Sequence, residues 1–550
     1  MPLRAAALLV VLALPGCAER EPTVAGRVYF GRAAAPEHDV FRFDNGSEPE
    51  SIDPALASAQ PDGRVAKLLF EGLTREDPRT LEPAPGQAER WEIADQGRVY
   101  TFHLRPGIRW SDGRPVTAAD FRWAWLRVLS PATGSRNAGT LAVIRGAARY
   151  TAGTLTEPDS VGIRAVDDRT LVVTLERPTA YFLHLTQLPA MLPVRRDVVE
   201  RWGAAWTRPG RLIGNGAFTL AAWRQNERFV FDRAPSYWDA AHVRLQQVIA
   251  YTIDDLAASM NLYKTGMLDW DPSGEIPTSF IPHMRRYADY RHGPFQALYF
   301  YSIDVTRKPF DDVWVRRALN YAIDREAIAR DLLQGSRDAW GNMTPDGYPG
   351  YPRPAGLGYD PARARACLAR AGYPGGRGFP TLHLLFNTSE DHRRIAEAVQ
   401  AMWTRVLGIP VELENQEWGS YLAATAGLRY DVARRSWIGD YLDPYTFLAI
   451  WRSGDGNNRT GWSDATYDSL LDAASATPDP ATRLAILARA ETRLLDQCPV
   501  IPLQQYATHE LVKPYVQGIE PTPLDVHPLT AVWIDRDWRS RATQVAGGPR

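Results

Sequence analysis

The sequence contains few cysteines, few lysines and no excess of charge of either sign. Only three cysteines occur in 550 residues, so the chain cannot form the disulfide framework typical of small secreted proteins. The 63 basic and 64 acidic residues almost cancel. Nearly all the basic residues are arginines, which we attribute to coding bias in the source genome. A chain without a basic excess gives no reason to expect nucleic acid as a partner.

Long hydrophobic runs are also missing. The apolar stretch Ala5–Leu14 is too short to span a bilayer, which needs about 20 apolar residues. Arg4 precedes this stretch, and its last residue begins the sequence Leu14-Pro15-Gly16-Cys17. This arrangement resembles a bacterial lipoprotein signal over residues 1–17, in which the cysteine becomes lipidated. An ordinary secretory signal with an incidental cysteine is the alternative, and both predict an exported protein.

Enzyme signatures are missing as well. The chain has no Gly-x-Ser-x-Gly, His-Glu-x-x-His or Walker motif, and no Gly-x-Gly-x-x-Gly that opens a helix. The ten histidines are scattered, without the spacing of metal ligands on one helix. A metal site would need ligands from distant parts of the chain, which the sequence does not suggest. We therefore predict no catalytic residue, no metal and no cofactor.

Strand and helix patterns alternate along the chain. Strand-like runs occupy 99–104, 170–175 and 411–414, and a helical pattern covers about 394–407. Further helices are predicted to begin after Thr117, Asp311 and Asp360, since short polar residues there can cap a helix. Strands that alternate with helices of this length predict an α/β fold.

The regions outside this pattern carry weaker signals. Residues 18–39 are polar and contain Pro, Gly and Ala, which predicts a flexible tether. Residues 541–550 are predicted to be a frayed tail. Cys367 lies in a helical pattern and is predicted to be a buried free thiol, although a bridge between Cys367 and Cys498 stays open at this stage.

Specific motifs follow one another from Phe41 to Ile534, over about nine tenths of the chain. They include Ser51-Ile52-Asp53-Pro54, Leu69-Phe70-Glu71-Gly72-Leu73, Trp110-Ser111-Asp112-Gly113, Tyr237-Trp238, Glu414-Asn415-Gln416-Glu417-Trp418 and Asp431-Val432-Ala433-Arg434. With these motifs the sequence resembles the periplasmic oligopeptide-binding proteins of ABC importers, in the extracellular solute-binding protein family 5. Binding proteins with other ligands share the early motifs, so the assignment to peptides rests on the later ones.

The resemblance implies a two-lobed α/β periplasmic-binding-protein fold with an extra domain packed on the first lobe. The chain is expected to cross between the lobes twice. Lobe I would comprise residues 40–70, 193–295 and 508–540. The extra domain II would comprise 71–192, and lobe III would comprise 296–507. Ligands of such proteins are bound between the lobes, which close around them.

The resemblance also implies charged groups for the two ends of a peptide. Asp440 matches the family's acidic residue that pairs with the peptide's amino group; a turn-forming aspartate is the alternative. Arg434 and His392 match positions that meet the carboxylate, and Arg307 aligns where some members carry lysine. A solvated loop charge is the alternative for Arg307, and a helix N-terminal residue is the alternative for His392.

Backbone and aromatic contacts complete the expected site. The peptide backbone would be held by residues 58–61 on one side and 436–438 on the other, as an added strand. The residues concerned are Ser58, Ala59, Gln60, Ser436, Trp437 and Ile438. Trp418, Trp437 and Tyr506 match aromatics that line the pocket, although such residues are often only part of a core.

The resemblance implies a monomeric receptor, tethered by its N-terminal lipid, that delivers short peptides to a membrane permease driven by a separate ATPase. The first alternative is the same fold with another ligand, such as a nickel chelate, haem, a sugar or a cell-wall peptide. The second is an exported chaperone or a signalling receptor with this fold, and the third is a hydrolase.

Overall fold

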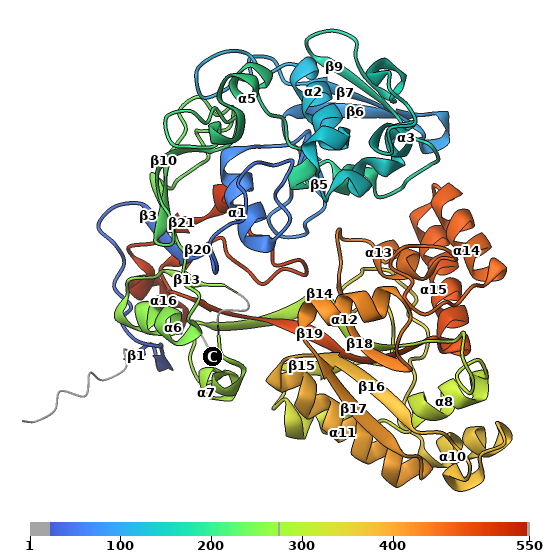
Figure 1. Ribbon diagram of the computed structural model, residues 1–550. Coiled ribbons are helices and arrows are strands. Elements are labelled where there is room, and N and C mark those ends of the chain that lie inside the picture. The colour runs from blue at the N-terminus through green and yellow to red at the C-terminus, as the bar shows by residue number, and fades with distance from the viewer. Residues whose placement is uncertain (1–22, 273–275, 547–550) are drawn as a thin grey trace, which may run out of the picture.

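The computed structural model describes residues 23–272 and 276–546, and it confirms the α/β fold with two lobes and an extra domain (Figure 1). Two long antiparallel strands, β14 (Tyr290–Ile303) and β19 (Val500–Val512), run through the centre of the molecule. They join the strands of both lobes into one sheet of eleven strands. The two lobes are therefore connected by continuous strands rather than by loops alone.

Lobe I lies at one end of this strand pair. Its strands follow the order β10, β11, β12, β3, β13 and then β19 across the sheet. The pairing of β3 with β12 is parallel and so needs a crossover connection, and domain II is inserted in the chain between them. The elements are β3 (Val40–Asp44), α1 (Gln60–Leu69), β10 (Phe218–Arg224), β11 (Arg228–Arg233), β12 (Gln247–Tyr251), α6 (Leu256–Thr265) and β13 (Trp270–Asp271).

Lobe III lies at the other end, where the order is β14, β18, β16 and β17. Successive residues of β14 face opposite sides of the sheet. Tyr299 and Tyr301 pack against α8, α10 and α11, and Leu298 and Phe300 pack on the other side with α14 and α15. The elements are α8 (Val313–Tyr321), α10 (Pro361–Arg370), β16 (Leu382–Asn387), α11 (Glu390–Leu407), β17 (Val411–Gln416), β18 (Val432–Ile438), α14 (Ala465–Ala476) and α15 (Pro480–Gln497).

Domain II has its own sheet of four strands, in the order β6, β7, β9, β8. Helix α2 (Ala118–Leu129) packs on it, and its Trp125 is fully buried and donates a hydrogen bond of 2.8 Å to the carbonyl of Met191. The helix begins directly after Thr117, as predicted, because Asp120 accepts a hydrogen bond from the Thr117 backbone N–H. The strands are β6 (Ala88–Ala94), β7 (Val99–Leu104), β8 (Ile163–Ala165) and β9 (Thr170–Thr174).

The central pair of strands is interrupted between the lobes. Pro294 pairs with Ala507, and the next paired residue of β14, Leu298, is opposite Gln505. An advance of four residues along β14 therefore corresponds to two residues along β19, and the regular pairing of the two strands is interrupted at this point. The expected crossing at 295/296 lies within this break, and the one at 507/508 lies next to it.

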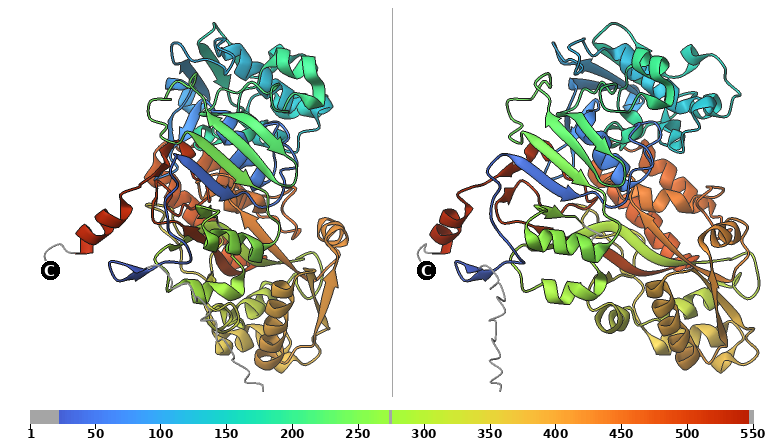
Figure 2. Two further views of the ribbon diagram at one scale, coloured as in Figure 1. Left: turned by 90° about the vertical axis from the view of Figure 1, so that its left-hand side faces the viewer. Right: turned by 60° about the vertical axis from the view of Figure 1, so that its left-hand side comes forward.

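Helices and strands extend closer to both ends of the chain than the sequence predicts. A short hairpin, β1 (Thr23–Val24) and β2 (Arg27–Val28), leads to the buried Tyr29 and Phe30. Figure 2 shows this hairpin and α16 (Trp538–Ala546) on the same side of the molecule, where the rings of Tyr29 and Trp538 are 5.4 Å apart. The described part of the expected tether, residues 23–39, thus contains a hairpin and buried aromatic residues, and residues 541–546 of the expected tail continue α16.

The sequence also gives expectations for the three cysteines. Cys17 and the predicted signal over 1–17 lie outside the described residues. Cys367 and Cys498 are both free and buried, so the two thiols are not paired. Burial raises the pKa of the Cys498 thiol to about 12, which leaves it uncharged and unreactive at neutral pH.

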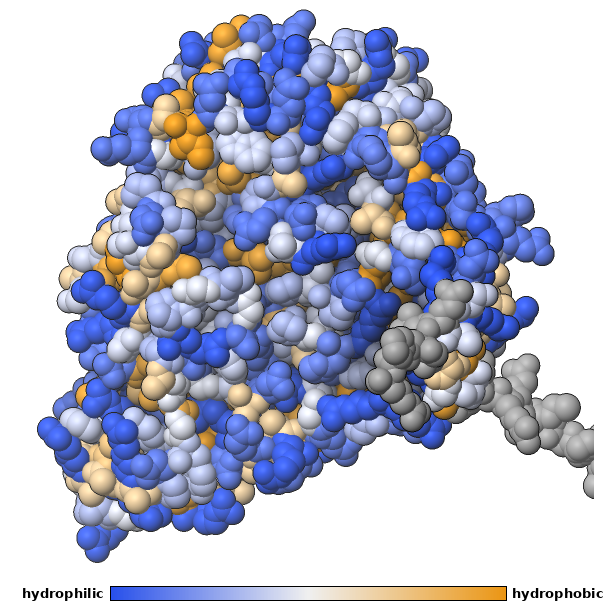
Figure 3. All heavy atoms as spheres, turned by 180° about the vertical axis from the view of Figure 1, so that it is seen from behind, coloured by the Kyte–Doolittle hydropathy of each residue, from blue (hydrophilic) through white to orange (hydrophobic). Residues whose placement is uncertain are grey.

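Of the helices between residues 23 and 546 that the structure describes, none is long and apolar enough to cross a bilayer. On the face seen in Figure 3, hydrophilic side chains are spread over the whole molecule and apolar side chains form small patches between them.

Candidate functional site

A cavity of about 380 Å³ lies where lobe I, domain II and lobe III meet. The beginning of α1, residues 187–190 of domain II and the C-terminal segment 525–530 form most of its wall. Lobe III contributes Gly439 and Asp440, which directly follow β18. The cavity therefore has walls from parts of the chain that are far apart in sequence.

Asp440 is the acidic group that lobe III presents to this cavity. Its backbone N–H donates to the Thr446 hydroxyl at 3.2 Å, and that hydroxyl lies 3.4 Å from the carboxylate oxygen Oδ2. The side chain is open to the solvent of the cavity, yet the surrounding walls limit its hydration, and this burial raises the pKa of its carboxyl. In the part of the chain that the structure describes, no basic side chain forms an ion pair with Asp440.

Strand β18, which leads to Asp440, has one unpaired edge. It pairs with β14 from Val432 to Ile438, whereas β16 pairs only with the first two residues, 432 and 433. Among the described residues, no strand covers the edge over 434–438. The N–H of Gly439 donates to a β14 carbonyl at 2.8 Å, so by alternation the N–H and C=O groups of Ser436 and Ile438 face the unpaired edge. This edge can accept an added strand.

Arg434 lies at the other end of the unpaired edge. Its side chain is held by Asn387 Oδ1 at 3.4 Å from Nη1 and by the Tyr506 hydroxyl at 3.3 Å from Nη2. The guanidinium carbon lies 4.8 Å from the centre of the Tyr299 ring. The residue is only 7% exposed, and no carboxylate among residues 23–272 and 276–546 forms an ion pair with it. A buried cation without a counter-ion is costly, and an anionic ligand would compensate it.

Two further nitrogen-bearing side chains lie beside Arg434. His392, in the first turn of α11, has its ring 5.5 Å from that of Tyr299. Burial, together with the charges of Arg434 and Arg337, lowers the pKa of His392 to about 3. At neutral pH the imidazole is therefore neutral and can offer hydrogen bonds only.

Arg337 is the second guanidinium of this group. It belongs to β15 (Arg337–Ala339), which places it opposite Tyr506 on β19. Its guanidinium carbon lies 4.6 Å from the centre of the Tyr506 ring, and Nη2 lies 3.0 Å from Oδ2 of Asp391. The other terminal nitrogen, Nη1, is buried and has no hydrogen-bond partner among the described residues. Arg434 and Arg337 thus approach Tyr506 from different elements and make this end of β18 electropositive.

Comparison with known proteins decides the family. The model of the bacterial extracellular solute-binding proteins, family 5 (middle region), matches residues 82–459. The chain is 35% identical over 506 residues to the periplasmic oligopeptide-binding protein OppA of Escherichia coli strain K12, with 90% of this chain and 92% of the relative covered. The chain belongs to the family 5 solute-binding proteins.

Two further proteins are similar to this family 5 protein over most of its length. It is 36% identical over 512 residues to the probable deoxycholate-binding periplasmic protein YgiS of the same bacterium, with 90% of this chain and 93% of the relative covered. Among solved structures, the unliganded open form of the murein tripeptide binding protein MppA superposes with a TM-score of 0.80 at 35% identity. That alignment covers 91% of this chain and 98% of the other. The predicted family membership is confirmed.

The structure separates Arg307 from the other expected site residues of this solute-binding protein. The Arg307 guanidinium lies 2.8 Å from Oδ2 of Asp304 and 3.7 Å from Oδ1 of Asp431, and it also donates to the carbonyl of Tyr430. These contacts satisfy its charge at the far end of β14 and β18 from Asp440. Arg307 is therefore paired within lobe III, whereas Arg337, which the sequence does not single out, packs against Tyr506 of the candidate site.

The expected backbone contacts differ between the two walls. On lobe I, residues 58–60 line the cavity, but the N–H groups of Ser58 and Ala59 donate to the Asp62 carboxylate at 3.0 and 3.2 Å. These two groups cannot also donate to a ligand, because Asp62 caps the beginning of α1. The Gln60 side chain is bonded to Asp525. On lobe III, residues 436–438 form the unpaired edge described above.

The aromatic side chains divide into exposed and packed ones. Trp418, the first residue of α12 (Trp418–Ala426), is 53% exposed and stacks on Tyr421 at 5.5 Å. Ile438, at the end of β18, is 58% exposed. Trp437 instead packs on the core of lobe III, and Tyr506 is half-buried between the two arginines. The exposed Trp418 and Ile438 are available to a ligand, whereas Trp437 is mainly structural.

Proposed function

We propose that this solute-binding protein captures short peptides with free termini and delivers them to the permease of an ABC importer. One observation carries the proposal: an unpaired strand edge has a buried arginine at one end and is followed by an acidic residue at the other. Arg434 would receive the peptide's carboxylate, Asp440 its amino group, and Ser436 and Ile438 its backbone. Relatives named for oligopeptides support the same assignment.

The length of β18 limits the length of the ligand. Arg434 and Asp440 are six residues apart, which corresponds to roughly 20 Å along an extended chain at about 3.3 Å per residue. The side chains of both residues reach toward a ligand and shorten this span. A peptide of about three to six residues fits between the two charges, because an extended peptide has the same rise per residue.

Closure of the lobes would complete the site. The broken ladder near Pro294 and Ala507 lies between the lobes, and we propose that the strands bend there, as in hinge closure around a ligand. Such a motion brings lobe I and domain II toward Asp440, excludes water and strengthens the terminal charge pairs. The proposed domains keep the boundaries 40–70, 193–295 and 508–540 for lobe I, 71–192 for domain II and 296–507 for lobe III.

The family and the named relatives indicate an exported, periplasmic binding protein. We further propose that Cys17 carries a lipid that tethers the chain to a membrane, that the protein is a monomer and that it does not catalyse turnover of the peptide. The buried and unreactive Cys367 and Cys498 are consistent with a binding role.

A ligand other than a peptide is the second candidate, because one relative is named as probably deoxycholate-binding. Deoxycholate carries a carboxylate that Arg434 would also receive, together with a large apolar body. It has no amino group for Asp440. Asp440 is therefore the residue that distinguishes the two candidates.

Titration calorimetry with blocked peptides tests the proposal. We expect a free tetrapeptide to bind, and its N-acetylated and C-amidated forms to bind at least tenfold more weakly, because each block removes one charge pair and tenfold equals about 1.4 kcal/mol. Blocked peptides that bind as tightly as the free one would defeat the assignment of the two charges. Binding of deoxycholate without binding of free peptides would favour the second candidate.

A further inference from the structure

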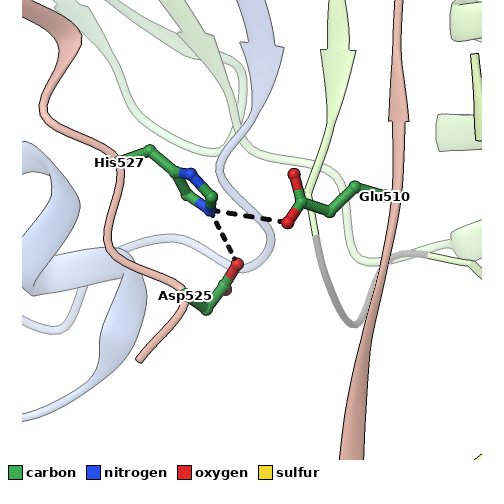
Figure 4. Close-up of side chains that lie close together, drawn as sticks. All are labelled: Glu510, Asp525 and His527. Carbon is green, nitrogen blue, oxygen red and sulfur yellow. Dashed lines mark hydrogen bonds and ion pairs between the residues drawn. The ribbon is translucent and has the colours of Figure 1, made fainter. Parts of the chain in front are cut away.

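A buried cluster of three side chains lies in the wall that lobe I contributes to the cavity. Glu510 comes from β19, and Asp525 and His527 come from the C-terminal segment that follows it (Figure 4). Their side chains are at most 2% exposed, yet Asp525 and His527 line the cavity. The cluster is therefore shielded from bulk solvent but can be reached from the cavity.

Each of the three side chains directs one potential ligand atom toward a common point. His527 Nε2 lies 3.0 Å from Asp525 Oδ1 and 3.6 Å from Glu510 Oε1. Figure 4 marks both contacts with dashed lines. Ligand atoms at about 2.0–2.2 Å from one metal ion are roughly 2.8–3.1 Å apart at octahedral angles and roughly 3.3–3.6 Å apart at tetrahedral angles. The two distances from His527 fall in these ranges, and all three ligand atoms lie within 4.8 Å of one another.

A proton on His527 does not satisfy the cluster. At 3.0 Å an Nε2 proton can bond to Asp525, but 3.6 Å is too long for a second hydrogen bond to Glu510. Glu510 Oε1 accordingly has no hydrogen-bond partner within the described chain, although the residue is completely buried. A buried carboxylate oxygen without a partner is costly, and this atom is directed at the His527 nitrogen. Its only described polar contact is the 3.6 Å ion pair with His527, so this oxygen has hydrogen-bonding or metal-binding capacity left over.

The other oxygen of each carboxylate is already held. Trp270 Nε1 donates to Glu510 Oε2 at 3.1 Å. Asp525 Oδ2 lies 3.0 Å from the Arg64 guanidinium and also accepts from the Gln60 amide. Outer contacts of this kind orient metal ligands in known sites. Here they leave Oε1 of Glu510 and Oδ1 of Asp525 free to face His527.

From this geometry we propose that Glu510, Asp525 and His527 bind one divalent transition-metal ion at the wall of the cavity. One imidazole nitrogen and two carboxylate oxygens suit ions such as Zn²⁺ better than Mg²⁺ or Ca²⁺, which prefer oxygen ligands only. The ion occupies the Nε2 lone pair, so any proton on Nε2 is released to solvent on binding. The bound ion joins β19 to the C-terminal segment and, through Gln60 and Arg64, to α1.

The site is independent of the proposed peptide contacts, because none of its three ligands is assigned to a peptide terminus. The test is calorimetric titration of EDTA-treated, untagged protein with Zn²⁺ alone, without peptide. We expect one equivalent to bind to the wild type. Glu510→Gln and His527→Asn should bind Zn²⁺ at least tenfold more weakly, because each removes one ligand atom.

His103→Asn is the matched control, since His103 Nε2 lies 3.1 Å from a single carboxylate, Glu92, outside the cluster. It should retain the wild-type equivalent. Should the cluster variants fail to fold, anomalous diffraction from Zn²⁺-soaked wild-type crystals gives a second measurement, with a peak expected between the three side chains. A wild type that binds no Zn²⁺, equal binding in Glu510→Gln, or no such peak would overturn the proposal.

Discussion

Replacing Arg434 by methionine should weaken the binding of a free tetrapeptide about 100-fold, or about 2.7 kcal/mol. The substitution removes a buried cation that has Tyr506 and Asn387 as partners but no carboxylate. The ligand-free protein should be as stable as the wild type or more stable, because an uncompensated buried charge is replaced by an apolar side chain of similar length. Calorimetry and urea unfolding measure the two effects.

Arg435→Met is the matched control for this prediction. Arg435 follows Arg434 on β18 but faces the opposite side of the sheet, where Nη1 donates to the carbonyl of Asn457 at 2.8 Å. Its loss should reduce stability and leave peptide affinity within about twofold of the wild type. Affinity that is unchanged in Arg434→Met, or lost equally in both variants, would show that Arg434 does not meet the ligand.

Replacing Asp440 by asparagine should weaken free peptides about 100-fold at pH 7 and leave N-acetylated peptides unaffected. The charge pair with the amino group is lost, and truncating one partner of a buried pair costs about 2–5 kcal/mol. Asp443→Asn is the control, because the Asp443 carboxylate is bound by Arg483 at 2.6 and 3.0 Å rather than by ligand. That variant should lose stability but retain the preference for a free amino group.

The pH dependence of binding follows from the raised pKa of Asp440. Burial places this pKa above the ordinary value of 3.8, so affinity for free peptides should fall as pH drops toward that raised value. For the ligand-free protein the sign is opposite. Because the charged form is disfavoured in the folded state, Asp440 favours stability at low pH and loses this contribution as pH rises through its folded pKa. Asp440→Asn should remove both effects.

The predictions for Arg434→Met and Asp440→Asn rest on the same physical argument. Arg434 is deeply buried, burial disfavours the charge of Asp440, and neither residue has an oppositely charged partner among the described residues. Natural proteins accept such local costs where a ligand compensates them. The expected pattern, with affinity lost and stability retained, separates ligand-binding charges from structural ion pairs such as that of Asp443 with Arg483.

Local sequence signals predicted the elements that have strong periodicity or a cap. The α2 boundary at Thr117 was correct because its capping contact is only three residues long. The helix expected from 394 in fact begins at Glu390, since its first turn, residues 390–393, contains no apolar residue to extend the pattern. The contact by which Asp62 caps α1 is equally local. It could therefore have been predicted, and it excludes the N–H groups of Ser58 and Ala59 as donors to a ligand.

Contacts between distant segments were not predictable in the same way. Arg337 lies in a strand of three residues, and only its register with β19 brings it to Tyr506 and Arg434. The pairing of Arg307 with Asp304 is local, but its second carboxylate, Asp431, is brought close only by the fold. The cluster of Glu510, Asp525 and His527 depends on side-chain directions that no spacing rule encodes.

The most direct test is a crystal structure of the protein with bound tetraalanine. We expect the peptide to lie extended along residues 434–438 of β18, with its carboxylate at the Arg434 guanidinium and its amino group at Asp440. Backbone hydrogen bonds to Ser436 and Ile438 should hold its centre. A peptide bound elsewhere in the cavity, or with its termini away from Arg434 and Asp440, would contradict this account of recognition.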